Sequence, residues 1–195
     1  METDDLVEWA RRREAQFAAD ALKEAALREL VLKELIGGLW HTTHPDRFQS
    51  ILRDGAILPN PSLPDSERWG ANVDESHYPY VRTLRGISLF DFGGFDPDAY
   101  SRKYQASSWP YFVPYHGVWG RAIWIELARE RLTLPQFLSG RDVLAKWQAD
   151  KAHGHNFMPE IEAAYLGNLP TTAFKRAFEV SKETHLIKPV ALVLP

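Results

Sequence analysis

A short strand that runs directly into a short helix, within residues 39–59, is the feature of this chain that most restricts its fold. Thr43 or His44 can cap the start of that helix, because a side-chain acceptor there pairs with a free backbone N–H. Pro45 suits the first helical turn, where the N–H that proline lacks is not needed. Gly55 can take the left-handed conformation that ends a helix. These signals fix both ends of the helix and the position of the strand before it.

The apolar side chains of this helix recur at helical spacing, which predicts that one face of the helix packs inward. They are Phe48, Ile51 and Leu52. An inward-packed helix fixes His41 and Thr42 on the strand just ahead of it. We therefore expect this strand to form one edge of a substrate-binding site.

Length and composition predict one domain with a core of its own, since 45% of the 195 residues are hydrophobic and 12% are aromatic. Residues 4–35 contain neither proline nor glycine, and Gly37 and Gly38 follow them. This stretch predicts one long helix or a helical pair. We divide the chain into an N-terminal helical extension, residues 1–36, and a folded domain, residues 37–195.

The rest of the pattern mixes strands and helices without regular alternation, which predicts an α+β fold with a split, mostly antiparallel β-sheet and helices to one side. Prolines and glycines are frequent between residues 58 and 114, so we expect loops there that shape a pocket. Strands are predicted at 87–90, 121–127, 161–166 and 190–193, and helices at 100–106, at 135–150 with an interruption near 139–140, and at 171–180.

Charge and composition argue against several classes of protein. A formal charge of −3 argues against binding nucleic acid by bulk electrostatics, although it leaves room for a local basic patch. The chain has no cysteine, and therefore no disulfide, thiolate nucleophile or cysteine-based zinc site. It has no apolar run of membrane-spanning length and no signal-peptide pattern at its start, so we expect a cytoplasmic protein without a membrane partner.

Seven histidines are present, with His41 and His44 forming one close pair and His153 and His155 another. Zinc proteases carry two histidines separated by three residues on a helix, and neither pair has that spacing. The segment around His153 has the composition of an exposed loop, so we expect no metal. No glycine-rich phosphate loop and no serine-nucleophile elbow occur either.

Three segments, in order along the chain, resemble the motifs of one enzyme family. The first is residues 39–59, the second is residues 86–92 (GISLFDF), and the third is residues 160–170 (EIEAAYLGNLP). Together they resemble ADP-ribosyltransferase-fold proteins, most closely the DarT-type toxins that modify nucleic acids and more distantly the RNA 2′-phosphotransferases. The resemblance covers residues 38–195 and implies an ADP-ribosyltransferase-like domain that consumes NAD.

A glutamate on a late strand is the catalytic residue that the resemblance implies. Breaking the bond between ribose and nicotinamide builds positive charge on the sugar, and a fixed carboxylate stabilises that charge. Glu162 is the candidate because its spacing from Pro170 fits the third motif. Glu160 is expected on the same face of the strand and stays the alternative. Alternatively, Glu162 pairs with an arginine or lies on a solvated face.

The first two motifs supply candidate NAD-binding residues, as the resemblance implies. His41 is expected to hydrogen-bond a ribose hydroxyl, and Thr42 to hold the nicotinamide amide. The alternative for His41 is a buried imidazole satisfied by a backbone carbonyl. Ser88 corresponds to the small polar residue of the second motif. Phe90 or Phe92 can stack on the nicotinamide ring, although core packing explains both equally well.

The diphosphate of a dinucleotide needs cations where no glycine-rich loop binds it. Arg47 stands at a position where the resembled toxins more often have asparagine. Each arginine could equally be a solvated surface residue. The candidates are Arg47, Arg53, Arg82 and Arg85.

The favoured hypothesis is an enzyme that consumes NAD and transfers ADP-ribose to a macromolecule (DNA, RNA or protein) in a toxin or phage-defence setting. An NAD glycohydrolase would use the same residues, and an RNA 2′-phosphotransferase is disfavoured by the shortage of clustered basic residues. An antitoxin or a second copy of the chain is an expected partner for the N-terminal helix.

A non-catalytic module that binds a partner through aromatic loops is the second hypothesis. Exposure of Trp109, Tyr111 and Trp119 would favour this module. Convergence of His41 and Glu162 on one pocket would favour the enzyme instead.

Overall fold

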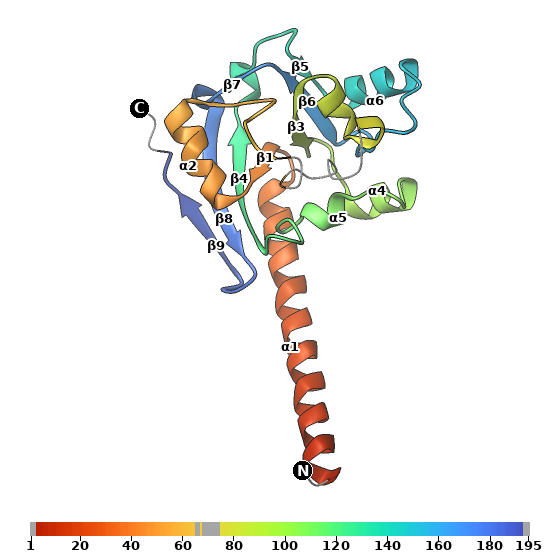
Figure 1. The fold of residues 1–195 in the computed structure, drawn as a ribbon, viewed down its shortest axis with the longest axis vertical. Coiled ribbons are helices and arrows are strands. Elements are labelled where there is room, and N and C mark those ends of the chain that lie inside the picture. The colour runs from red at the N-terminus through yellow and green to blue at the C-terminus, as the bar shows by residue number, and fades with distance from the viewer. Residues whose placement is uncertain (1–2, 65–66, 68–74, 193–195) are drawn as a thin grey trace.

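The fold is a mixed α+β arrangement around one antiparallel sheet (Figure 1). The computed structural model describes residues 3–64, 67 and 75–192. The strands are β1 (Leu39–Thr43), β2 (Ala56–Ile57), β3 (Gly86–Asp91), β4 (Arg121–Leu127), β5 (Phe137–Leu138), β6 (Glu162–Leu166), β7 (Leu169–Pro170), β8 (Phe174–Ser181) and β9 (Leu186–Val190). The helices are α1 (Thr3–Leu35), α2 (Pro45–Asp54), α3 (Tyr80–Thr83), α4 (Pro97–Lys103), α5 (Trp109–Phe112) and α6 (Gly140–Ala149), with short 3-10 turns η2 (Glu75–His77), η3 (Arg129–Arg131) and η4 (Thr171–Ala173).

Within the described part of the chain, seven strands hydrogen-bond in the order β5-β6-β3-β1-β4-β8-β9, and β2 pairs with β7. Every pairing is antiparallel. The predicted α+β class with an antiparallel sheet is therefore confirmed. The order of the strands in the sheet differs from their order in the sequence. Strands that are far apart in the chain, such as β3 and β6, are therefore neighbours at the centre of the sheet.

The central strands β1 and β3 separate soon after they meet. They share only two residue pairs, Leu39 with Asp91 and Trp40 with Phe90. Beyond Trp40, β1 continues to pair with β4 as far as Thr43, while β3 pairs with β6 along its length back to Gly86. The two halves of the sheet are thus joined at one end of β1 and diverge toward the other end.

The long helix predicted at the N-terminus is present as α1, which projects away from the sheet (Figure 1). Its C-terminal turns belong to the core, because Leu27, Val31 and Leu35 are buried there against residues of the sheet. Its projecting part leaves Trp9 and Phe17 exposed. The last turns of the extension, residues 1–36, therefore pack as part of the domain. No helix in the described residues has both the length and the apolar character needed to cross a membrane.

Helix α2 begins and ends where the sequence predicts. Nδ1 of His44 accepts a hydrogen bond of 3.3 Å from the backbone N–H of Asp46, and Pro45 opens the first turn. Gly55 ends the helix with φ +71°. Phe48 is buried on the inward face, so the helix packs beside the strand that it follows.

The helix predicted at 171–180 is wrong, because this segment is the turn η4 followed by strand β8. The register between β4 and β8 shifts at Glu126 and Leu127, and the shift inserts an extra residue into β8 next to Phe174. Phe174 and Ala177 therefore face the same core although they are three residues apart. A β-bulge produces apolar spacing that imitates a helix.

Three other predicted elements differ from the structure at their boundaries. The closing strand is β9, Leu186–Val190, instead of 190–193, and Val193 lies outside the described residues. The first part of the helix predicted over 135–150 is wrong, because residues 137–138 form the strand β5, and α6 begins only at Gly140, after a capping box of Ser139 and Asp142. The helix predicted at 100–106 is α4, which begins earlier because Asp96 caps it.

Candidate functional site

A cavity of about 600 Å³ lies where β1 and β3 diverge. His41 and Thr42 of β1, Ser88 of β3 and Glu162 of β6 all line it. Residues from all three predicted motifs therefore meet at one cavity. The proline-containing segment after α2 also lines the cavity, in keeping with the expected role of these loops, through Leu58, Pro59, Pro61, Ser62 and Leu63.

Glu162 is the first residue of β6 and only 3% of it is exposed. Its Oε1 accepts a hydrogen bond of 2.6 Å from the hydroxyl of Ser88, and its Oε2 accepts one of 2.8 Å from the backbone N–H of Met158. Burial raises the pKa of Glu162 to about 7, and the two hydrogen bonds oppose that rise. The carboxyl group thus changes its charge near neutral pH, as carboxyl groups in active sites often do.

His41 is half-buried and its Nδ1 lies 3.1 Å from the carbonyl oxygen of Ser88. Because a carbonyl only accepts, Nδ1 carries the proton and Nε2 is left as an acceptor. Burial lowers the pKa of His41, so the imidazole is neutral at physiological pH. The imidazole is satisfied by a backbone carbonyl, as the alternative reading expects, and it also lines the cavity.

The neighbouring carboxylate, Glu160, lies in a different environment. Strand β6 starts only at Glu162, and Glu160 has a left-handed backbone with φ +64°. The expectation that the two glutamates share one face of a strand is therefore wrong. Glu160 forms an ion pair of 2.8 Å with Lys103, which lowers the pKa of the Glu160 carboxyl. It lines a second, more polar hollow together with Arg129 and Arg141.

Thr42 contributes a hydroxyl to the cavity that has no hydrogen-bond partner among the described residues, although the oxygen is buried. A buried hydroxyl without a partner is costly unless a ligand or water supplies one. Of the two predicted stacking residues, Phe90 lines the cavity and Phe92 is buried in the core behind it. Phe90 is therefore the better candidate for contact with a ligand.

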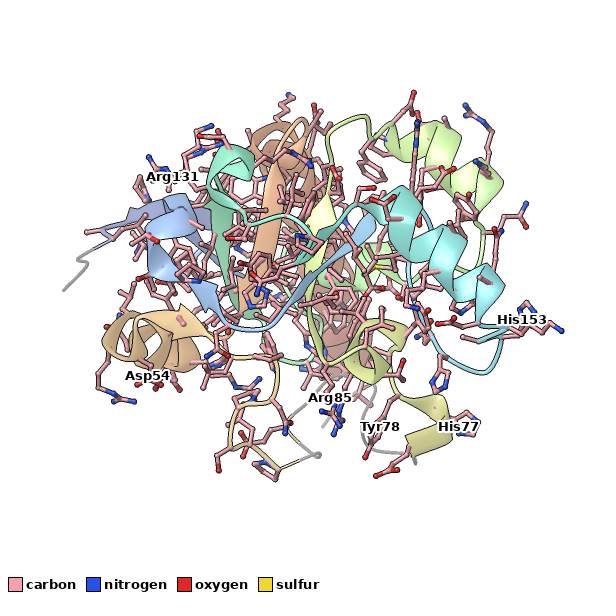
Figure 2. The ribbon with its side chains drawn as sticks, turned by 90° about the horizontal axis from the view of Figure 1, so that it is seen from above. Asp54, His77, Tyr78, Arg85, Arg131 and His153 are labelled. Carbon is pink, nitrogen blue, oxygen red and sulfur yellow. The ribbon has the colours of Figure 1, made fainter. Side chains whose placement is uncertain are left out.

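Three of the four candidate arginines line the cavity, namely Arg47, Arg53 and Arg82. The Arg47 guanidinium lies 5.3 Å from the centre of the Trp119 ring and hydrogen-bonds the carbonyl oxygen of Glu67 at 2.8 Å. Arg85 does not line this cavity. It is exposed, has φ +54° in the turn after α3, and lies toward one edge of the molecule in Figure 2.

An aromatic wall on the segment after α5 also lines the cavity, and the sequence reasoning missed its central residue, His116. The ring of His116 stacks on Trp119 with centroids 4.2 Å apart and meets the edge of Phe112 at 5.5 Å. His116 is 5% exposed, and neither ring nitrogen has a hydrogen-bond partner in the part of the chain that the structure describes. Burial, and to a lesser extent Arg47, lowers the pKa of His116 to about 4.

One feature of the sequence could have indicated His116. It is the single histidine among the tyrosine, phenylalanine and tryptophan residues of segment 109–119. From the sequence alone we interpret that segment only as a surface for binding partners. Its aromatic residues are largely internal, because Trp109 is buried and Trp119 lines the cavity, whereas Tyr111 is 40% exposed.

The other histidines do not gather into a metal site. No group of three or more histidine, cysteine, aspartate or glutamate side chains is placed to hold a metal ion within the described ranges. His153 is exposed at the periphery beyond α6 (Figure 2), and His155 contacts the carbonyl oxygen of Tyr78 at 2.9 Å through Nδ1.

The arrangement places a carboxyl group of pKa about 7, a neutral imidazole and a polar hydroxyl around one cavity that arginines also line. Such a site can stabilise positive charge that develops on a bound substrate, while the arginines face an anionic part of it. No protein-family model matches the chain, and no curated protein is significantly similar to it in sequence.

Proposed function

We propose that this protein is an NAD-consuming ADP-ribosyltransferase that modifies a macromolecule. The observation that carries the proposal is the meeting of Glu162 and His41 at one cavity, with Ser88 hydrogen-bonded to both side chains. These are the residues that the three resembled motifs single out, and they come from strands that are neighbours in the sheet. The antiparallel sheet that separates beside β1 supports the same fold family.

The proposed reaction breaks the bond between the ribose C1′ and the nicotinamide nitrogen, and the bonding electron pair leaves with nicotinamide. Positive charge then develops on the ribose, as in glycoside hydrolysis. The ionised Glu162 carboxylate stabilises this charge from a fixed position. An acceptor atom bonds to C1′ and loses its proton, which gives the ADP-ribosylated product.

The cavity suits a dinucleotide in size and chemistry. Its volume of about 600 Å³ lies within the range of small-molecule sites. The hydroxyl of Thr42, which has no partner among the described residues, and the acceptor Nε2 of His41 can bind the amide and hydroxyl groups of the nicotinamide riboside half. The cations Arg47, Arg53 and Arg82 on the lining suit its diphosphate.

The binding-module hypothesis receives less support from the same structure. Trp109 is buried and Trp119 lines the cavity, which leaves Tyr111 as the exposed member of the trio. His41 and Glu162 line one cavity, and this is the arrangement expected of the enzyme. Binding of an antitoxin or a second copy through α1 stays a prediction.

Release of nicotinamide from labelled NAD tests the proposal. We expect the wild-type protein to release nicotinamide and Glu162→Gln to lose at least 99% of that rate. Glu160→Gln is a matched control, because Glu160 is two residues away and pairs with Lys103 outside this cavity. It should keep most of the activity. A wild-type protein that releases no nicotinamide, with DNA, RNA and protein acceptors all present, would contradict the proposal.

The acceptor separates a transferase from a hydrolase in the same assay. Label from the adenine half of NAD should appear on DNA, RNA or protein if the enzyme is a transferase. If nicotinamide is released while all of this label stays in free ADP-ribose, water is the acceptor and the protein is an NAD glycohydrolase.

A further inference from the structure

His116 has an environment that favours a ligand-binding role. Only 5% of the residue is exposed to solvent, yet both ring nitrogens lack a hydrogen-bond partner among the described residues. Buried polar atoms nearly always have a hydrogen-bond partner in folded proteins. Two ring nitrogens without partners on one side chain therefore lower the stability of the folded state. Because His116 lines the cavity, a ligand bound there can supply both partners.

The neighbouring rings determine which parts of His116 a ligand can reach. One face of the imidazole is covered by the stacked Trp119, at 4.2 Å and 26°. The rings of Tyr111 and Phe112 meet it at steep angles of 75° and 65°. These contacts disfavour stacking of a ligand ring on His116. The ring faces are thus occupied by protein, whereas the two buried ring nitrogens are left without a partner among the described residues, so recognition occurs through hydrogen bonds.

A cation accompanies these hydrogen-bonding groups. The Arg47 guanidinium lies over Trp119 at 5.3 Å, and its charge is close enough to contribute to the lowered pKa of His116. Arg47 already pairs with the carboxylate of Glu67 at 3.3 Å, which shows that its guanidinium can bind an anion in its present orientation. The subsite therefore combines a neutral N–H donor with a fixed positive charge.

A chain of ring contacts indicates where His116 lies relative to Glu162, the carboxylate that the proposed function makes catalytic. Phe90 is paired with Glu162 across the strands, and its ring lies 5.4 Å from that of Phe112, which in turn lies 5.5 Å from His116. Two ring contacts, both made by Phe112, therefore connect His116 to Phe90, the residue paired with Glu162. In NAD the diphosphate begins at C5′ of the ribose whose C1′ reacts, one sugar ring away from the reacting bond.

We propose that His116 and Arg47 together bind the diphosphate of the dinucleotide, an inference that rests on the proposed function for the identity of the ligand. One nitrogen of the neutral imidazole donates its N–H to a phosphate oxygen. The other nitrogen accepts a hydrogen bond from a ribose hydroxyl. Arg47 pairs with the phosphate charge and gives up the carboxylate of Glu67.

Calorimetric titration with ADP-ribose tests this subsite without requiring catalysis. His116→Phe keeps an aromatic ring but removes both nitrogens, so we expect its Kd for ADP-ribose to rise about tenfold or more. His116→Gln keeps one donor and one acceptor and should bind with intermediate affinity. His153→Phe changes an exposed histidine that does not line the cavity, and this variant should bind as the wild type does.

Thermal melting and a double-mutant cycle complete the test. Because His116→Phe removes buried nitrogens that no described residue pairs with, its melting temperature should equal or exceed that of the wild type. Arg47→Gln should also weaken ADP-ribose binding, and the double variant should lose less than the product of the two single losses, since both residues contact one group. A wild-type Kd in His116→Phe, or fully multiplicative losses, would overturn the shared subsite.

Failure of this inference is distinguishable from failure of the proposed function. If the wild type releases nicotinamide but His116→Phe binds ADP-ribose normally, the subsite is wrong and the function stands. If ADP-ribose binding depends on His116 but no nicotinamide is released, the subsite stands and the function falls. Absence of ADP-ribose binding to the wild type overturns the subsite.

Discussion

The hydroxyl of Ser88 donates a hydrogen bond of 2.6 Å to Oε1 of Glu162, from the strand next to it in the sheet. The carbonyl of the same serine contacts Nδ1 of His41. Ser88 therefore orients the carboxyl group through its side chain and the imidazole through its backbone. Replacing its side chain alters only the first of these contacts, which makes the residue suitable for mutation.

Ser88→Ala should shift the pH dependence of NAD cleavage to higher pH. The hydroxyl stabilises the ionised form of Glu162 and holds the pKa of that carboxyl below the value that burial alone would give. Without the hydroxyl we expect the pKa of Glu162 to rise by about one unit. Initial rates measured between pH 5.5 and 9.5 should show the rising limb displaced by that amount, with the activity recovered at high pH.

Ser88→Thr provides the matched control for this shift because it keeps a hydroxyl on the same carbon. Its profile should stay close to that of the wild type. Equal losses of activity at every pH in Ser88→Ala, without displacement of the profile, would show that Ser88 does not act through the Glu162 carboxyl.

Glu162 should also make folding stability depend on pH. Its pKa is about 7 in the folded protein and ordinary, near 4.5, in the unfolded chain. The folded state therefore holds more protons than the unfolded state between these two values, so the free energy of unfolding falls as pH rises from about 4.5 to 7. The loss should reach about 2 to 3 kcal/mol by pH 8.

Urea denaturation of the wild type and Glu162→Gln at pH 5 and pH 8 measures how much Glu162 contributes to the pH dependence of the free energy of unfolding. The amide oxygen of glutamine can accept from the N–H of Met158, and its NH₂ group can donate to the oxygen of Ser88, so both contacts survive. The variant should lose less stability between the two pH values than the wild type. Equal losses would mean that the carboxyl group is not held in a protonated state by burial.

Local signals in the sequence were sufficient to predict the part of the site on β1 and α2. The cap at His44, the proline at 45 and the glycine at 55 act within a few residues of each other, so they can be recognised without knowing the tertiary structure. The strand that they position, with His41, lies where expected.

Features that depend on contacts distant in sequence could not be predicted in the same way. The bulge in β8 arises from its pairing with Glu126 and Leu127, and it gives Phe174 and Ala177 the spacing of a helix. The His116 nitrogens, which have no partner in the described part of the chain, are likewise a property of its packing against Trp119 and Phe112. A lone histidine carries no motif, so only the packed structure singles it out.

Thr42→Val should weaken NAD binding while leaving the free protein at least as stable. The Thr42 hydroxyl is buried beside the cavity without a partner among the described residues, so its removal relieves an unpaired polar atom. In the complex the hydroxyl would bind NAD, and its loss should raise KM about fivefold, which corresponds to about 1 kcal/mol.

Thr83→Val should behave in the opposite way and serves as the control. The Thr83 hydroxyl donates a hydrogen bond of 2.7 Å to the carbonyl of Tyr80 and does not line the cavity. Its loss should lower the melting temperature without changing KM. If Thr42→Val lowers stability and leaves KM unchanged, the hydroxyl has a structural partner and no role toward NAD.

The C-terminal turns of α1 should contribute to domain stability although the helix begins far from the sheet. Leu27 is 2% exposed and packs with Val31 and Leu35 in the core, whereas Leu30, three residues along the same helix, is 53% exposed. Leu27→Ala should destabilise the protein by about 2 to 4 kcal/mol, and Leu30→Ala by less than about 1 kcal/mol. Both changes introduce the best helix former, so loss of helix propensity cannot account for the difference. Urea denaturation of the two variants measures both values, and equal effects would mean that the helix is an independent extension that ends before the core begins.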